Sequence, residues 1–177
     1  SALSDYYERL LERNEEGISP FGFSQEKISY EIVLSPDGSV VSVNDIRDLS
    51  GKKPLPRSLS VPQPEKRTVG IKSNFLWDKT SYVLGVSATS KRADKEHEAF
   101  VEFHQEALKD EADENLEAFL AFIAHWKAED FKAPMFSEEM KDANVIFRLD
   151  GEHRYLHESP AARSVRARLL GVEEKAL

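Results

Sequence analysis

Residues 27–46 read KISYEIVLSPDGSVVSVNDI, and this stretch carries the clearest structural pattern of the chain. Over its first eight residues apolar side chains alternate with other residues, the apolar positions being Ile28, Tyr30, Ile32 and Leu34. Such alternation is typical of a strand that buries one face. Four turn-forming residues, SPDG, follow, and a second apolar segment begins at Val40. The stretch therefore predicts a β-hairpin.

Further short strands are predicted on either side of a proline-rich region. They lie at residues 59–61, 80–86 and 145–149, where apolar and β-branched residues gather. Prolines at positions 54, 56, 62 and 64 exclude a central-strand position for the residues between them, because proline cannot donate to a ladder of hydrogen bonds.

Helical periodicity replaces the alternation beyond residue 90. Apolar residues recur at helical spacing in two stretches, and they are Ala99, Phe100, Phe103, Ala107 and Leu108, then Leu116, Phe119, Leu120, Ile123 and Trp126. These stretches predict two amphipathic helices. A short helix is predicted at residues 4–13, and Ser159-Pro160 predicts the start of a last helix that carries Arg163, Arg166 and Arg168.

Together these elements predict an α+β fold: a small antiparallel β-sheet with a hairpin, packed with amphipathic helices and a helical insertion. We expect a single domain over residues 1–177, since 177 residues that are 40% hydrophobic can form one core. Residues 1–89 and 143–158 would be mainly β, residues 90–142 a helical subdomain, and residues 159–177 a terminal helix.

Composition narrows the classes of function. The chain has no cysteine, which excludes disulfides and thiolate metal sites. No apolar run approaches the roughly 20 residues of a membrane helix, and the first residues do not resemble a signal peptide. We therefore expect a soluble, cytoplasmic protein. A net charge of −8 opposes indiscriminate coating of nucleic acid, so any such contact must be local.

Positive charge is nevertheless concentrated in one region. Residues 47–72 contain seven lysines or arginines and two acids. Cations in a loop that is poor in helix-forming residues suit contact with a phosphodiester backbone, whose condensed counterions they displace. Composition alone leaves this role and a merely solvated surface equally open.

The second half of this region combines charge with hydrogen-bonding side chains. Lys66, Arg67, Lys72 and Lys79 supply cations, while Thr68, Ser73 and Asn74 supply short polar groups suited to phosphate oxygens and base edges. Phe75, Leu76 and Trp77 follow directly. We expect these three to anchor the loop in the core, and a wedge or stacking platform for bases is the alternative.

An enzyme is the weakest hypothesis. The densest set of potential metal ligands or acid–base groups is Asp150, Glu152, His153, His157 and Glu158. Gly151 favours a turn there, so the two histidines need not share a helix face. The Gly-x-Ser-x-Gly, phosphate-loop and dinucleotide fingerprints are absent from the sequence. We therefore predict no catalytic residues, no metal and no cofactor.

Several motifs in order resemble one protein family. They are DYYERL at residues 5–10, KISYEIVL at 27–34, PRSLSVP at 56–62, KRT at 66–68, NFLWDKTSYVLG at 74–85, FRLDG at 147–151 and HESP at 157–160. The chain resembles the N-terminal part of the large subunit of the type I-C CRISPR surveillance complex, Cascade. The family's chains are longer, so the resemblance identifies this one as an N-terminal fragment.

This resemblance implies a non-catalytic subunit of an RNA-guided interference complex. It would contact the protospacer-adjacent motif (PAM) of double-stranded target DNA, the guide RNA and other Cascade subunits, and help to recruit the separate helicase-nuclease. Phage anti-CRISPR proteins are a further candidate partner. We assign the DNA-binding loop to Lys66, Arg67, Thr68, Lys72, Ser73 and Asn74, and contacts with the DNA backbone or guide RNA to Lys52, Lys53, Arg57 and Lys79.

A protein-interaction module is the main alternative. Its basic loop would dock on an acidic partner, and either the acidic helices of residues 94–127 or the segment 131–136 would form a contact surface. Both functions are compatible, because a subunit of a large complex must also touch its neighbours.

Overall fold

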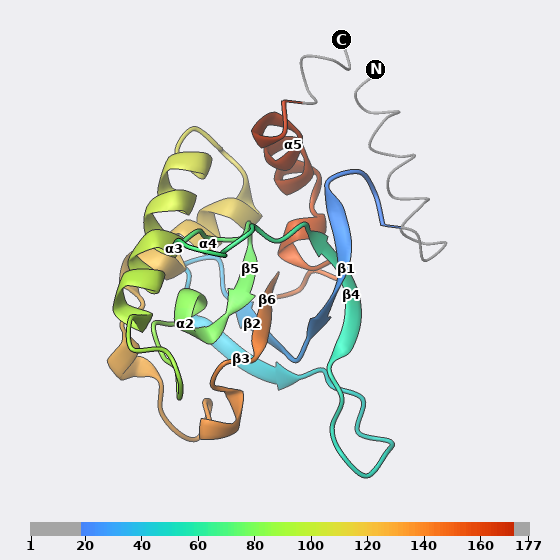
Figure 1. Cartoon of the computed structure of the whole chain (residues 1–177). Helices are drawn as coiled ribbons and strands as arrows, with labels where there is room; N and C mark the ends of the chain where they lie inside the picture. Colours follow the sequence, from blue (N-terminus) through green and yellow to red (C-terminus); the bar gives the residue numbers. More distant parts are fainter. Residues whose placement is uncertain (1–18, 172–177) are drawn as a thin grey trace.

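The α+β class is confirmed by the computed structural model, which describes residues 19–171 (Figure 1). The strands are β1 (Phe23–Ile28), β2 (Tyr30–Leu34), β3 (Val40–Asp45), β4 (Arg57–Pro62), β5 (Trp77–Lys79) and β6 (Asn144–Leu149). The α-helices are α2 (Thr80–Val83), α3 (Ala93–Leu108), α4 (Glu114–His125) and α5 (Pro160–Leu169). Three single-turn 3₁₀ segments complete the chain, at Ala128–Asp130, Glu138–Met140 and Leu156–Glu158.

Two sheets are present among the described residues. The larger has the strand order β3-β2-β6-β5, and the smaller is a two-stranded antiparallel ribbon of β1 and β4. The predicted hairpin is the β2–β3 pair, with Ile32 opposite Val43. The larger sheet is mixed, because β6 returns from the helical region and pairs parallel to β2 while β5 pairs antiparallel to β6.

The first predicted strand proves to be two. Ser29 interrupts it, so that residues before Ser29 form β1 in the ribbon and residues after it form β2 in the larger sheet. Ser29 donates its N–H to the carbonyl of Asn144 and accepts from the N–H of Ile46, each at 3.0 Å. The sequence alternation therefore located extended chain correctly but did not reveal that the chain changes sheets.

The strand predicted at residues 80–86 was wrong. Its first residues form the short helix α2, closed by a 2.9 Å hydrogen bond from the Leu84 N–H to the Thr80 carbonyl. The neighbouring strand β6 begins at Asn144, which pairs with Lys79, so no strand remains for residue 80 to pair with. Apolar composition alone cannot distinguish a buried strand from a buried helical turn.

The larger sheet has a core on each face. Tyr30, Ile32 and Phe147 face α3 and α4 in the main core, whereas Ile28, Val61, Trp77 and Ile146 form a smaller cluster toward the ribbon. Figure 1 shows this order of layers, with α3 and α4 on one side of the sheet and the β1–β4 ribbon on the other. The Trp77 indole N–H joins the layers by donating to the Pro62 carbonyl at 2.7 Å.

The amphipathic helices lie where periodicity placed them, as α3 and α4. The last helix, α5, starts as predicted: the Ser159 hydroxyl accepts from the Ala162 N–H and Pro160 occupies the first turn. The helix predicted at residues 4–13 and the end of the terminal helix lie outside the described residues. Among residues 19–171, no helix is long and apolar enough to cross a membrane.

Candidate nucleic-acid interface

The basic region forms two separate segments. Residues 48–56, here called the finger, connect β3 to β4, and residues 63–74, here called the basic loop, connect β4 to the segment that enters β5. The finger extends beyond the ends of its two strands in Figure 1. Strand β4, which the sequence predicted at residues 59–61, separates the two segments.

The finger has its own hydrogen bonds. Asp48 and Leu55 exchange backbone hydrogen bonds of 2.8 and 3.0 Å, and the Asp48 carboxylate accepts from both the N–H and the hydroxyl of Ser50. The Arg57 guanidinium donates to the Ile46 carbonyl at 2.8 Å. Lys52 and Lys53 are exposed beyond these contacts. The finger therefore presents two lysines on a defined support.

The basic loop is held by Arg67. Its guanidinium forms an ion pair with Asp78, donates through Nε to the Lys72 carbonyl at 2.7 Å, and lies 3.8 Å from the centre of the Tyr82 ring. A planar guanidinium suits this combination of carboxylate, carbonyl and aromatic face. Arg67 therefore attaches the basic loop to buried residues of the protein interior.

Asp78 is the buried partner in this arrangement. Its side chain is 1% exposed and accepts from the backbone N–H groups of Asn74 at 3.0 Å and Lys79 at 2.8 Å. Burial raises the pKa of Asp78, and the Arg67 guanidinium opposes that rise. One carboxylate thus contacts β5, the last residue of the loop and Arg67 within the loop.

Ser73 and Asn74, which we predicted to contact DNA, are buried at 5% and 3% exposure. The Asn74 side-chain oxygen accepts from the Glu65 N–H at 2.9 Å, and the Ser73 hydroxyl donates to the Asn74 carbonyl at 2.8 Å. In this conformation both side chains bond within the protein. Together with Arg67 they support the loop rather than face a partner.

The outward-facing residues are the remaining ones of the predicted loop. Lys66, Thr68 and Lys72 are exposed, whereas Lys79 is half-buried at the end of β5. The structure therefore separates the predicted set into three supporting residues and three that a ligand could reach.

The predicted anchor of the loop is confirmed. Phe75, Leu76 and Trp77 are at most 3% exposed, which excludes them as a wedge or stacking platform in this conformation. Leu76 has a positive φ of 62°, a backbone region that costs a branched residue energy. The Leu76 N–H donates to Nε2 of His104 at 2.9 Å.

His104 was not singled out by the sequence. It lies on α3, donates from Nδ1 to the Phe100 carbonyl at 2.8 Å and stacks on Phe75 with 5.8 Å between ring centres. Full burial lowers its pKa to about 3, so the ring is neutral and Nε2 is free to accept from Leu76. In the sequence, the only feature that could have indicated this role is the position of a histidine within an apolar helical stripe.

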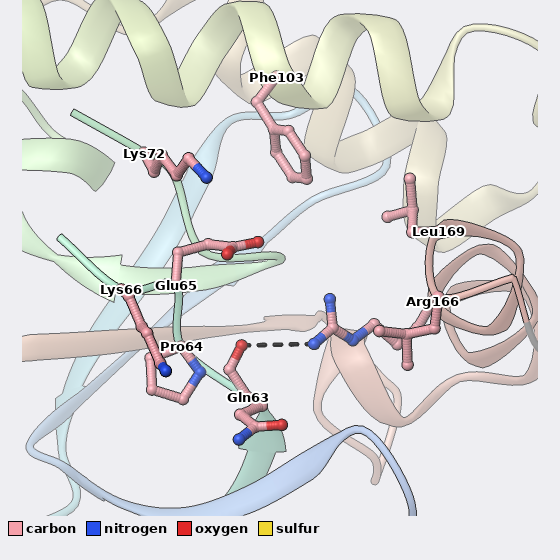
Figure 2. Close-up of a pocket in the computed structure, with 9 residues that line it drawn as sticks. Gln63, Pro64, Glu65, Lys66, Lys72, Phe103, Arg166 and Leu169 are labelled. Carbon is pink, nitrogen blue, oxygen red and sulfur yellow. Dashed lines mark hydrogen bonds between the residues drawn. The ribbon is translucent and has the colours of Figure 1, made fainter. Parts of the chain in front are cut away.

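A groove of about 490 Å³ opens beside the basic loop (Figure 2). Its walls come from the loop, α3 and α5, and the lining residues are Gln63, Pro64, Glu65, Lys66, Lys72, Phe103, Arg166, Leu169 and Leu170. A second hollow of about 340 Å³ adjoins it and shares Glu65, Lys72 and Phe103. The groove thus brings two of the predicted lysines together with residues distant in sequence.

Arg166 joins α5 to the base of the basic loop. One terminal guanidinium nitrogen donates to the carbonyls of Gly22 at 3.2 Å and Gln63 at 3.3 Å. Burial lowers the pKa of Arg166, and its Nε is buried with no hydrogen-bond partner among the described residues. The sequence placed Arg166 on a helix but could not place it beside residues 63–72.

The groups of the enzyme hypothesis do not form a shared site. His157 is 1% exposed and donates from Nε2 to the Ser60 carbonyl at 3.0 Å, while His153 is exposed on the turn after β6. Within residues 19–171 no group of three histidines and acids is placed to hold a metal ion.

Comparison with known protein families identifies the family of the chain. Residues 3–176 match the family model described as CRISPR-associated protein (Cas_Csd1). The search of curated proteins gives no match.

Proposed function

Because the chain belongs to the Csd1 family of CRISPR-associated proteins, we propose that it recognises DNA within an RNA-guided interference complex. In this proposal the protein is the large, PAM-contacting subunit of a type I-C Cascade and acts in the cytoplasm. It has no catalytic step of its own. It contacts the guide RNA and the other subunits, and it helps to recruit the helicase-nuclease.

The observation that supports this proposal most directly is the form of the basic loop. Lys66, Thr68 and Lys72 are exposed, while Arg67 and Asn74 hold the loop from inside. A loop that is already ordered loses less conformational entropy when a ligand binds. Two cations and a hydroxyl on such a support suit a duplex, where phosphate contacts position the protein and base contacts give selectivity.

Lys72→Ala is expected to relax PAM discrimination. If Lys72 contacts a base edge, its loss should reduce the difference in binding free energy between correct and incorrect duplexes by about 1–3 kcal/mol. The measurement is equilibrium binding of a reassembled surveillance complex to duplexes that differ only at the PAM. Lys91→Ala removes another exposed lysine, outside the loop, and serves as the control. Wild-type affinity and preference in the Lys72 variant would contradict the assignment.

The finger should contribute affinity without selectivity. Replacing Lys52 and Lys53 by alanine is expected to weaken all duplexes alike and to lower the slope of log K against log[salt] by about 0.9 for each lost phosphate contact. The measurement is binding of matched and mismatched duplexes at several salt concentrations. Weaker binding of only the matched duplex would instead show that the finger reads sequence.

A protein-contact role is the second candidate for the finger. Leu49 and Leu55 are 60% and 58% exposed beside the two lysines, and exposed leucines near cations suit a partner with an apolar surface and acidic groups. If this role dominates, Leu49→Ser with Leu55→Ser should impair assembly of the complex, while the lysine variant should assemble and bind DNA normally.

A further inference from the structure

We propose that the groove between the basic loop and α5 binds one unpaired nucleotide, with guanine as the preferred base. This inference rests on the proposed function, because it assumes that nucleic acid reaches the basic loop. It goes further by naming a ligand and a site away from the exposed tip of that loop.

The size and walls of the groove suit such a ligand. A volume of about 490 Å³ lies within the usual range of small-molecule sites, about 300–1,000 Å³. The lining combines apolar side chains, those of Phe103, Leu169 and Leu170, with the charged side chains of Glu65, Lys66 and Lys72. A nucleotide likewise has an apolar base face and a charged phosphate.

One carboxylate among three cations favours a ligand that is not a phosphate alone. The Glu65 carboxylate lies between Lys72 and Arg166 in Figure 2, where it would repel a phosphate placed in the centre of the groove. The Asn74 side chain fixes the Glu65 backbone through its 2.9 Å hydrogen bond. The Glu65 side chain is exposed, so its carboxylate can accept hydrogen bonds from a ligand, while the lysines accommodate a phosphate at the rim.

Guanine satisfies both demands. Its Watson–Crick edge places two adjacent donors, N1–H and the N2 amino group, beside the acceptor O6. A carboxylate can accept both donors at once. The Arg166 guanidinium lines the same groove and supplies a cation for the acceptor O6. The other bases offer the carboxylate fewer adjacent donors.

Phe103 provides the surface for stacking. Its ring projects from α3 into the groove in Figure 2. Edge contacts hold it from behind, with 6.4 Å to the Phe75 ring centre and 5.0 Å to that of His104. Stacking on an aromatic side chain is a common way to bind an unpaired base. The stacking residue is therefore Phe103, not the buried Phe75 or Trp77.

Short single strands test this inference on the whole chain. The probes are labelled strands of thymidines whose central position is guanine, cytosine, adenine or abasic, together with RNA counterparts in uridine. We expect the guanine strand to bind about tenfold more tightly than the abasic one, the scale of one stacked base. A guanine preference in both DNA and RNA supports a site that accepts either kind of nucleotide. A guanine preference in only one of them identifies whether the ligand is DNA or RNA.

Two variants separate the base contacts from general charge. Glu65→Gln should abolish the guanine preference while leaving abasic binding unchanged or tighter, because it removes a negative charge. Phe103→Leu should weaken the guanine strand most and reduce its difference in affinity from the strand with the abasic centre. Glu117→Gln, an exposed acid on α4, is the matched control, and urea unfolding of each variant verifies the fold.

Equal binding of all strands, or a guanine preference that survives Glu65→Gln, would overturn the nucleotide site. The duplex-binding experiment with Lys72→Ala distinguishes a failure of the nucleotide site from a failure of the proposed function. If PAM discrimination still depends on Lys72, the single-nucleotide site alone is wrong. If that dependence is also absent, the proposed function of the basic loop fails with it.

Discussion

Replacing Asp78 by alanine is expected to lower the free energy of unfolding by about 3–5 kcal/mol, the usual cost of removing one partner of a buried ion pair. The side chain is 1% exposed, and its loss leaves Arg67 without its counter-charge. The backbone N–H groups of Asn74 and Lys79 lose their acceptor as well. Urea unfolding followed by circular dichroism measures the change.

A matched substitution separates this effect from a general loss of charge. Asp150 is exposed on the turn after β6, so Asp150→Ala should change stability by less than about 0.5 kcal/mol. The double variant of Arg67 and Asp78 should be no less stable than Asp78→Ala alone, because no unpaired charge then remains. A loss below about 1 kcal/mol in Asp78→Ala would show that the carboxylate does not support the basic loop.

Acidification is expected to cost about 4 kcal/mol of stability between pH 7.5 and pH 5. His104 and His157 have folded-state pKa values of about 3 and about 4, against an ordinary value of 6.5. Burial is the main cause for both. Between these values the unfolded chain binds protons that the folded protein does not, at about 1.4 kcal/mol per pH unit for each group.

The sign of the effect follows from this difference. The contribution of these two histidines to stability is fully present above their unfolded-state pKa of about 6.5. It falls as the pH drops toward their folded-state pKa values of about 3 and about 4. Urea midpoints at pH 7.5, 6 and 5 measure it. His153→Gln, which removes an exposed histidine, should leave the pH profile unchanged, whereas His104→Gln should flatten it by about half. Equal midpoints at pH 7.5 and 5 would show that neither ring is held neutral.

The His104 variant also links stability to the proposed site. His104 accepts from the strained Leu76 and supports Phe103 from behind, so its loss should loosen both the anchor of the basic loop and the wall of the groove. PAM discrimination should therefore decline in His104→Gln although the residue reaches no ligand.

Local patterns were enough to identify most elements. The hairpin of β2 and β3, the amphipathic helices α3 and α4, and the capped start of α5 each depend on a few neighbouring residues. Strand β4 and strand β6 were also located correctly. The errors arose where pairing partners decide, at Ser29 and at residues 80–86. At these positions the same residues could form a continuous strand or a different structure. The position of β6 determines which one forms, because β6 ends the pairing at Lys79.

The candidate site shows the same division. The sequence by itself identified a basic region, its aromatic anchor and the residue types suited to nucleic acid, because charge and polarity belong to each residue wherever it lies. Only the tertiary structure separated Arg67, Ser73 and Asn74, which bond inward, from Lys66, Thr68 and Lys72, which face outward. It also brought Phe103 and Arg166 beside Glu65. Burial and long-range contact depend on how the whole chain packs, and no local pattern records them.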